Sequence, residues 1–389
     1  MSDFQFDILE PAACRQLEPA LPIDLWVYRY RDNSTGWLLS IATHGEPNSH
    51  KLSLGGFRIA PESRASQPGY NNDREAIGLA MGMEEKVFWS RLIGVGGPLG
   101  IRNLKRVVGG KCVLLPGKDA RVGQPLDFAL LDFAVSCLRH FEETSGVLIT
   151  TGQDLGHGIM SDGQTPSLKY LNERFPGSIL SDTSKPTAEG NFHTLRGGLR
   201  ALSVKPDRSR IGLIGAGNIG LHLLHRLRDE GAECLVVESH PGRSEELRQA
   251  GIPVFHPADK GRFLAEPLDA LALNANGGSL DTPTIAAICG NTRLRFISGC
   301  ENLVMPDPAG NETLRQGGKI YTPTELCGMM GYLTAVEEYL CWREGSPYQM
   351  TDMFKAAEKL DEASFRATTR IMERDFACTF EEAMREVYA

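Results

Sequence analysis

A glycine-rich segment in the second half of the chain has the residue types and spacing of a dinucleotide-binding turn. Residues 215–220 read GAGNIG, directly after the apolar run 211–214 and before a helical pattern. The first glycine of such a turn permits the tight bend, the second lets the backbone approach a pyrophosphate, and the third lets helix and strand pack closely. Free N–H groups at the start of the helix attract the phosphates. The residues predicted to bind the cofactor here are Gly215, Ala216, Gly217, Asn218, Ile219, Gly220 and, farther along the chain, Asn274.

An acidic residue at the end of the next strand-like run indicates which dinucleotide is bound. Glu238 follows the apolar run 234–237, where a carboxylate accepts hydrogen bonds from the hydroxyl groups of the adenosine ribose. The same carboxylate repels a 2′-phosphate, so the pattern favours NAD over NADP. His240 and Arg243 are close enough in the sequence to leave NADP as the alternative.

Three charged residues of the first half are candidates for chemistry beside a nicotinamide. Lys86 lies at the margin of the apolar stripe of the helical segment 74–89, Lys111 begins the strand-like run KCVLL, and Asp154 lies in a glycine-rich loop. Each also has a purely structural explanation. A lysine beside an apolar stripe usually extends to solvent, and an acidic residue in a glycine turn usually stabilises that turn.

The elements that must position these residues follow two different patterns. Short β-rich runs at 25–31, 36–44 and 52–61 precede the helical segments 74–89 and 126–143, whereas from Arg210 strands and helices alternate. Alternation of this kind predicts a doubly wound parallel sheet. We therefore expect an α/β protein with an α/β substrate domain over 1–180 and a Rossmann-type NAD-binding domain over 181–344. The helical tail 345–389 is expected to pack back and complete the first domain.

Taken in order, short segments along nearly the whole chain resemble the glutamate/leucine/phenylalanine/valine dehydrogenase family, most closely its leucine–phenylalanine–valine branch. The segments are LGGFRI (54–59), LAMGMEEK (79–86), GGKCVLL (109–115), TTGQDLG (150–156), PTAEGNFHTLRG (186–197), GLIGAGNIG (212–220), ISGCENLV (297–304) and YTPTEL (321–326). Members of this family reversibly deaminate an L-amino acid to its 2-oxo acid, using NAD and releasing ammonia. The resemblance implies that activity for this chain, and a homo-oligomer is the default assembly for such enzymes.

The resemblance implies a role for each charged candidate. Lys86 would bind the substrate carboxylate, Lys111 would be the catalytic lysine, and Asp154 would exchange a proton with the substrate amino group. We expect a lowered pKa for Lys111, because burial and the charge of Lys86 both disfavour its ammonium form. The neutral amine can then activate water to attack the iminium. Such a site belongs in a cleft between the two domains, where closure would exclude water.

The remaining roles follow from the same resemblance. Gly55 and Gly56 would form a backbone floor under the substrate, and Thr187 would face the nicotinamide. Asn302 would help to hold both cofactor and substrate. Phe57, Gly152 and Tyr332 would line the side-chain pocket. Gly152 leaves room there for a larger substrate side chain, such as an aromatic one.

The chain also departs from the family pattern. The two lysines stand farther apart than is usual, and an alignment without a gap would put Pro98 at the position of the catalytic lysine. The gapped alignment is preferred because GGKCVLLPG continues as the expected strand, which makes 89–107 an insertion near the cleft. His157 stands where a small hydroxyl residue is common, so it either reaches the site or belongs to a surface loop. The Asn-Ala-Gly-Gly pattern of the family is lost near 327–333.

These departures leave two alternatives to an amino-acid dehydrogenase. The first is an imine or carbonyl oxidoreductase on the same scaffold that releases no ammonia. The second is a catalytically inactive NAD-binding protein, as the alignment on Pro98 would imply.

The composition and charge of the chain argue against several other classes of protein. The formal net charge is −8 without a lysine or arginine block, which argues against a nucleic-acid partner. No run approaches the roughly 20 apolar residues of a membrane span, and the acidic start does not resemble a signal peptide. The nine cysteines are scattered, as in reduced cytoplasmic proteins. His44 and His50 lack the spacing and further ligands of a zinc site, so no metal is expected.

Overall fold

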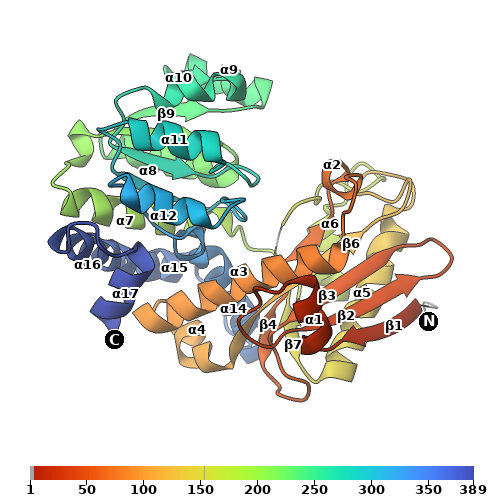
Figure 1. Ribbon diagram of the computed structural model, residues 1–389. Helices are drawn as coiled ribbons and strands as arrows, with labels where there is room; N and C mark the ends of the chain where they lie inside the picture. Colours follow the sequence, from red (N-terminus) through yellow and green to blue (C-terminus); the bar gives the residue numbers. More distant parts are fainter. Residues whose placement is uncertain (1–3, 153) are drawn as a thin grey trace. The chain divides into compact units, whose positions relative to one another are not determined.

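The structure, a computed structural model, describes residues 4–152 and 154–389, which form two compact units (Figure 1). The first unit contains the described residues up to Phe88 together with Pro98–Thr183 and Tyr332–Tyr348. The second contains Trp89–Gly97, Ser184–Gly331 and Gln349–Ala389. The stretch Pro98–Thr183 of the first unit is followed directly by Ser184–Gly331 of the second, next to the boundary expected at 180/181. The expected α/β class is confirmed.

The first unit is built on a mixed sheet. Its strands are β1 (Phe4–Leu9), β2 (Trp26–Asp32), β3 (Leu38–Thr43), β4 (Leu52–Leu54), β5 (Phe57–Ile59), β6 (Val107–Leu115) and β7 (Leu148–Thr150). The order is β1-β2-β3-β6-β4-β7, with β5 also paired to β6. Neighbours from β1 to β6 are antiparallel, whereas β4 and β5 run parallel to β6 and β7 runs parallel to β4. The carboxyl ends of β4, β5 and β7 therefore share one edge of the sheet.

Helices cover both faces of this sheet because successive strand residues point to opposite sides. Ile41 and Cys112 pack with Phe141 of α5 (Asp127–Ser145), whereas Ala42 and Val113 pack with α3 (Asn72–Ile93). The other helices with residues in this unit are α1 (Pro11–Leu17), α2 (Glu62–Ala65), α4 (Pro98–Asn103), η1 (Leu104–Arg106), α6 (Ser167–Arg174) and α14 (Met329–Glu344).

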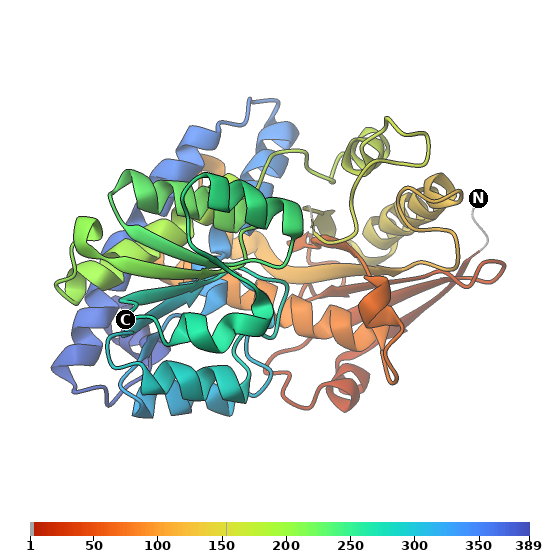
Figure 2. The same ribbon diagram turned by 90° about the horizontal axis from the view of Figure 1, so that it is seen from above.

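The second unit is a doubly wound parallel sheet with helices on both sides (Figure 2). Its strands, in spatial order, are β10 (Val254–Phe255), β9 (Glu233–Val237), β8 (Arg210–Ile214), β11 (Ala270–Leu273), β12 (Phe296–Gly299) and β13 (Ile320–Tyr321). Helices on both faces explain why these strands are short, continuous apolar runs. The order reverses between β8 and β11, which is where such folds bind ligands.

The helices of the second unit include the tail of the chain. They are α7 (Ser184–Ala201), η2 (Pro206–Arg208), α8 (Asn218–Asp229), α9 (Pro241–Gln249), η3 (Pro257–Asp259), α10 (Lys260–Leu264), α11 (Thr282–Gly290), α12 (Ala309–Gln316), α13 (Thr324–Cys327), α15 (Met350–Ala357), α16 (Lys359–Glu373) and α17 (Phe380–Tyr388).

The expectation that the tail 345–389 completes the first domain is wrong for residues 349–389. Helix α16 packs along α7 of the second unit: a Cβ added to Gly197 would overlap the backbone of Asp361. Arg196 and Arg200 bind the Asp361 carboxylate at 2.5 and 2.7 Å. This close approach and the shared carboxylate hold the tail on α7. Residues Tyr332–Tyr348, expected in the second domain, belong to the first unit instead.

Within the described ranges, no helix is both long and apolar enough to cross a membrane. The nine cysteines are free thiols, and all but Cys289 are buried.

Candidate active site

Lys111 and Asp154, two of the predicted residues, form a buried ion pair in the first unit. Nζ of Lys111, in the middle of β6, donates to Oδ2 of Asp154, which lies in the loop after β7. Their side chains are only 6% and 11% exposed. A Cβ added to Gly56 would lie 3.1 Å from Nζ of Lys111, so the lysine amine lies directly against this glycine. The structure therefore brings Lys111, Asp154 and Gly56 together.

The two glycines before Lys111 bring helix α3 close to the same place. A Cβ on Gly109 would overlap the backbone of Glu84, whose carboxylate accepts the Gly109 N–H at 2.5 Å. Lys86 follows two residues later on α3 and is buried, with 8% exposure. Its charge is close enough to Lys111 to lower the pKa of that lysine. The GGK sequence thus lets β6 and α3 place two lysines near each other.

Arg58 is a buried charged residue of this site that sequence analysis missed. Its guanidinium contacts the two Asp154 oxygens at 3.3 Å each, and it donates to Glu75 at 2.8 Å. Glu75 also accepts from Arg64 at 2.9 Å. Arg58 is the middle residue of β5, and its side chain is 4% exposed. A charge in the middle of an apolar strand needs buried partners, and this was the signal in the sequence.

The electrostatics of the pair depend on burial and on the number of nearby cations. Burial lowers the pKa of Lys111, Arg58 and Lys86 lower it further, and Asp154 opposes the shift. Burial raises the pKa of Asp154, but Lys111 and Arg58 outweigh this and hold it well below its usual value. Asp154 is therefore a carboxylate at neutral pH, and Lys111 loses its proton more readily than an ordinary lysine.

His157, whose role the sequence left open, is tied into the same loop. One ring nitrogen lies 2.9 Å from the carbonyl oxygen of Phe57, and the other lies 3.2 Å from the Ser167 hydroxyl. Burial lowers the pKa of His157, although Asp154 raises it. Both ring nitrogens therefore contact the protein itself, which favours a structural role in fixing the loop that carries Asp154.

Of the residues expected to line a side-chain pocket, Gly152 faces the most open space. The nearest atom to a Cβ added there is the Cβ of Ala335, at 3.9 Å. Gly55 has no such room, because its added Cβ would lie 2.5 Å from a methyl group of Ile149. Phe57 belongs to the apolar core of the first unit instead, and Tyr332 is buried on α14.

The predicted dinucleotide site is a pocket of about 660 Å³ in the second unit. Gly215 adopts φ +90°, in the left-handed region that favours glycine. A Cβ on Gly220 would overlap the carbonyl of Gly215, whereas one on Gly217 would meet nothing within 4 Å. The third glycine is thus needed for packing, and the second leaves the backbone open to a ligand. Helix α8 begins at Asn218, followed by Ile219.

Glu238 lies at the edge of this pocket and is 8% exposed. Its carboxylate accepts the N–H groups of Ala216 and His240 at 2.8 and 2.7 Å, which leaves acceptor positions for hydroxyl groups. The His240 ring caps helix α9 (Pro241–Gln249) by accepting the Arg243 N–H. The Arg243 guanidinium pairs with Glu246 at 3.1 Å. The two side chains that left NADP open as an alternative therefore have partners within the protein.

Asn274 presents an amide to the same pocket. Its oxygen accepts from Asn191 at 3.2 Å and from the Cys300 N–H at 3.3 Å. Its buried Nδ2 has no hydrogen-bond partner among the described residues, so this donor is available to a ligand. The loop that follows is held by buried Glu301, which accepts from the N–H groups of Ala275 and Ser279.

The other predicted residues are divided between the two units. Thr187 is buried on α7, and Asn302 is exposed after β12. Both belong to the second unit, whereas Lys86, Lys111, Asp154, Gly55 and Gly56 belong to the first. Pro98 begins helix α4. No group of three or more His, Cys, Asp or Glu residues in the described part of the chain could hold a metal ion.

Comparison with known proteins places the chain among amino-acid dehydrogenases. No family model matches it. A valine dehydrogenase of Streptomyces albus is 23% identical over 314 residues, which cover 79% of this chain and 78% of that protein. A phenylalanine dehydrogenase of Thermoactinomyces intermedius is 27% identical over 234 residues, 59% of this chain and 61% of that protein.

Solved structures share the fold. The L-tryptophan dehydrogenase from Nostoc punctiforme has a TM-score of 0.61 and 20% identity, with 91% of this chain and 92% of that chain covered. The fold, the ordered motifs and these relatives together lead to one conclusion. The chain is similar to members of the glutamate/leucine/phenylalanine/valine dehydrogenase family, and these relatives confirm the resemblance.

Proposed function

We propose that this protein catalyses the NAD-dependent oxidative deamination of an L-amino acid to its 2-oxo acid, with release of ammonia, and that it acts as a homo-oligomer. The observation that carries the proposal is the buried Lys111–Asp154 pair against Gly56, with the charge of Lys86 nearby. An acid–base pair beside a further cation suits a substrate that has both a carboxylate and an amino group.

The residues of the first unit account for the proton movements. Lys86 binds the substrate carboxylate, and the backbone of Gly55 and Gly56 supports the substrate. The carboxylate of Asp154 stabilises the positive charge on the substrate nitrogen and exchanges a proton with it. Nζ of Lys111, with its lowered pKa, takes a proton from the water that adds to the iminium carbon. That proton then passes through Asp154 to the carbinolamine nitrogen, and Lys111 takes the proton of the new hydroxyl group as the C–N bond breaks, which releases ammonia and the 2-oxo acid.

The pocket of the second unit fits NAD. The backbone at Gly217 is open, Glu238 has acceptor positions left, and Asn274 has an unpartnered buried donor. When bound, NAD supplies the acceptor for the hydride from the substrate α-carbon. Gly215–Gly220 and the start of α8 would hold its pyrophosphate, Glu238 its adenosine ribose, and Thr187 and Asn302 would hold its nicotinamide side.

The proposed substrate has a large side chain, because Gly152 contributes none of its own. A Cβ added at Gly152 would reach van der Waals distance of the Ala335 Cβ, at 3.9 Å, so the absence of that side chain is what leaves room for the substrate. Gly152→Val should therefore lower kcat/KM for an aromatic amino acid by about tenfold or more relative to valine. An equal loss for both substrates would reject this assignment.

The proposed reaction is tested by following NADH formation with a panel of L-amino acids. Lys111→Ala should lower kcat by about 10²-fold or more, whereas Lys118→Ala, at an exposed lysine after the same strand, should leave it unchanged. Full activity of Lys111→Ala would reject the assigned base. Turnover of a 2-oxo acid with NADH in the absence of ammonia would instead indicate an imine or carbonyl oxidoreductase.

A further inference from the structure

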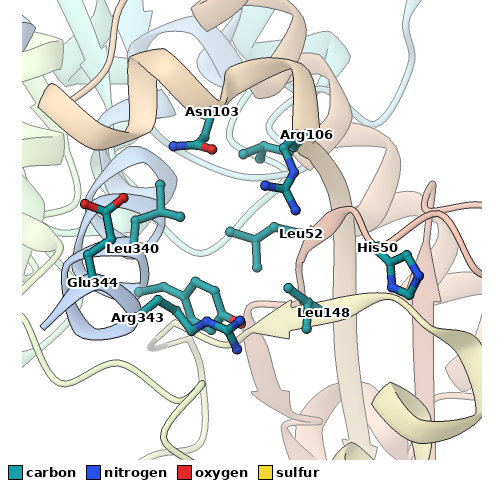
Figure 3. Close-up of a pocket in the computed structure, with 10 residues that line it drawn as sticks. His50, Leu52, Asn103, Arg106, Leu148, Leu340, Arg343 and Glu344 are labelled. Carbon is teal, nitrogen blue, oxygen red and sulfur yellow. The ribbon is translucent and has the colours of Figure 1, made fainter.

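A second pocket, which belongs to the first unit, lies at the ends of the sheet strands opposite to the candidate active site (Figure 3). Its volume is about 270 Å³, and it is lined by Leu52, Val107 and Leu148, the first residues of β4, β6 and β7. The sheet register pairs Leu52 with both of the others, so the three stand side by side. Gly55 follows the last residue of β4, roughly 10 Å farther along the strand direction. The pocket is thus separate from the substrate floor.

The insertion 89–107 supplies one wall of this second pocket. Asn103 ends α4, Arg106 ends η1, and both line the pocket. The carboxylate of Glu337 on α14 accepts the N–H groups of Leu99 and Gly100 at 2.9 and 2.6 Å, which anchors α4 to that helix. The opposite wall comes from the same helix and consists of Tyr339, Leu340, Arg343 and Glu344.

The second pocket combines an apolar floor with two cations. Figure 3 shows the side chains of Leu52 and Leu340 facing the space, with the guanidinium groups of Arg106 and Arg343 entering from different sides. Among the described residues, neither arginine forms an ion pair with an acidic side chain. Glu344 stands in the same wall, and Glu142, outside the lining, is close enough that Arg343 lowers its pKa while burial raises it. The lining itself holds two arginines and one glutamate, a surplus of one positive charge.

We propose that the second pocket binds a small carboxylate with a short branched apolar group. Guanidinium groups match the geometry and charge of a carboxylate, and no carboxylate of the described residues forms an ion pair with Arg106 or Arg343. The apolar group would lie against Leu52, Leu148 and Leu340. Ligand pockets commonly measure about 300–1,000 Å³, so a pocket of about 270 Å³ suits a molecule of amino-acid size and excludes a nucleotide. This proposal does not depend on the proposed function.

The proposal is tested by calorimetric titration of the full chain with isovalerate in the absence of NAD. Because isovalerate also fits a substrate-carboxylate site, the titration uses the Lys86→Gln chain. We expect one binding site there, with Kd raised about tenfold or more by Arg106→Gln or Arg343→Gln. Isovaleramide, which has the same shape without the charge, should bind at least about tenfold more weakly. Arg102→Gln, at an exposed arginine of α4 bonded to its own Pro98 carbonyl, should leave Kd unchanged.

Two outcomes would overturn the proposal. One is the absence of isovalerate binding to the Lys86→Gln chain, and the other is binding that neither arginine substitution weakens. If Lys86→Gln does not fold, Leu340→Trp fills the second pocket in the otherwise unchanged chain and should remove one isovalerate site from the titration. An unchanged stoichiometry would then reject the pocket. Calorimetry measures binding without turnover. A failure to bind isovalerate therefore does not count against the proposed deamination, and a lack of enzyme activity does not affect the binding result.

Discussion

Replacing Arg58 tests the electrostatics of the candidate active site most directly. Arg58→Met removes the guanidinium and keeps an unbranched apolar side chain. The change deletes two contacts of 3.3 Å with Asp154 and one of 2.8 Å with Glu75. Removing one partner of a buried ion pair costs about 3–5 kcal/mol of unfolding free energy. Because Asp154 keeps Lys111 and Glu75 keeps Arg64, we expect the lower end, about 3 kcal/mol, measured by urea unfolding.

The same substitution should move the pH dependence of activity in a fixed direction. The positive charge of Arg58 lowers the pKa of Lys111, so its removal raises that pKa. A smaller fraction of Lys111 is then neutral at a given pH, and the acid limb of kcat/KM shifts to higher pH. The loss of activity should therefore be larger at neutral pH than in alkaline buffer, as NADH formation measured across pH would show.

Two variants separate this electrostatic effect from simple loss of structure. Arg58→Lys keeps the charge and should leave the acid limb close to its original position even if stability falls. Arg64→Met removes a cation that also binds Glu75, at 2.9 Å, but does not contact Asp154. Its side chain is 32% exposed, so it should cost at most about 1 kcal/mol and leave the limb unmoved. A folded Arg58→Met enzyme with the original acid limb would refute the reasoning.

Four further predictions concern the cofactor pocket and acid stability. Glu238→Ala should raise KM for NAD about tenfold and improve the relative use of NADP, whereas Glu233→Ala, at the start of the strand that ends just before Glu238, should change neither value. Unchanged selectivity for Glu238→Ala would contradict the assignment. Gly220→Ala should destabilise the second unit by about 1–3 kcal/mol, because its Cβ would overlap Gly215. Gly217→Ala should fold normally yet lose the thermal stabilisation that NAD provides, and a full NAD-induced shift would count against an open backbone there. Asp154 and Glu75 both have lowered pKa values. Burial raises the pKa of each, but Lys111 and Arg58 outweigh burial at Asp154, and Arg58 and Arg64 outweigh it at Glu75. Their contribution to stability is therefore complete above about pH 5 and lost as pH falls further, so a urea midpoint that stays constant from pH 6 to 3 would contradict it.

Local patterns were sufficient to predict the second unit but not the placement of the tail. The glycine turn and the alternating strands are read from neighbouring residues, and the structure contains them at the expected positions. The tail also has a clear helical pattern, which indicates that one face is buried without indicating against what. Gly197, which permits close contact, and Asp361, which binds two arginines of α7, determine the partner. These contacts join residues far apart in the sequence.

The same limit explains the start of β6. The sequence analysis begins the strand-like run KCVLL at Lys111, whereas β6 begins at Val107. Both glycines stand inside the strand: an added Cβ would overlap Glu84 at the first position and Ser53 at the second. Both glycines are required because neighbouring elements pack closely against them, and not because the backbone bends there. The residue pattern of a single segment cannot distinguish a glycine needed for packing from one needed for a turn.

Arg58 shows what kind of functional residue such reasoning misses. The segment LGGFRI resembles the family through its glycines. Arg58, which stands between two apolar residues of that segment, can be noticed in the sequence as readily as the glycines. It demands a buried partner, but its two carboxylates come from residues 96 and 17 positions away. The candidate base, its acid and Arg58 therefore form one charge network, in which no single residue has its pKa set by its own segment. A chain that kept Lys111 and Asp154 but lost Arg58 would retain the motifs of the family and lose the electrostatic balance on which the proposed chemistry depends.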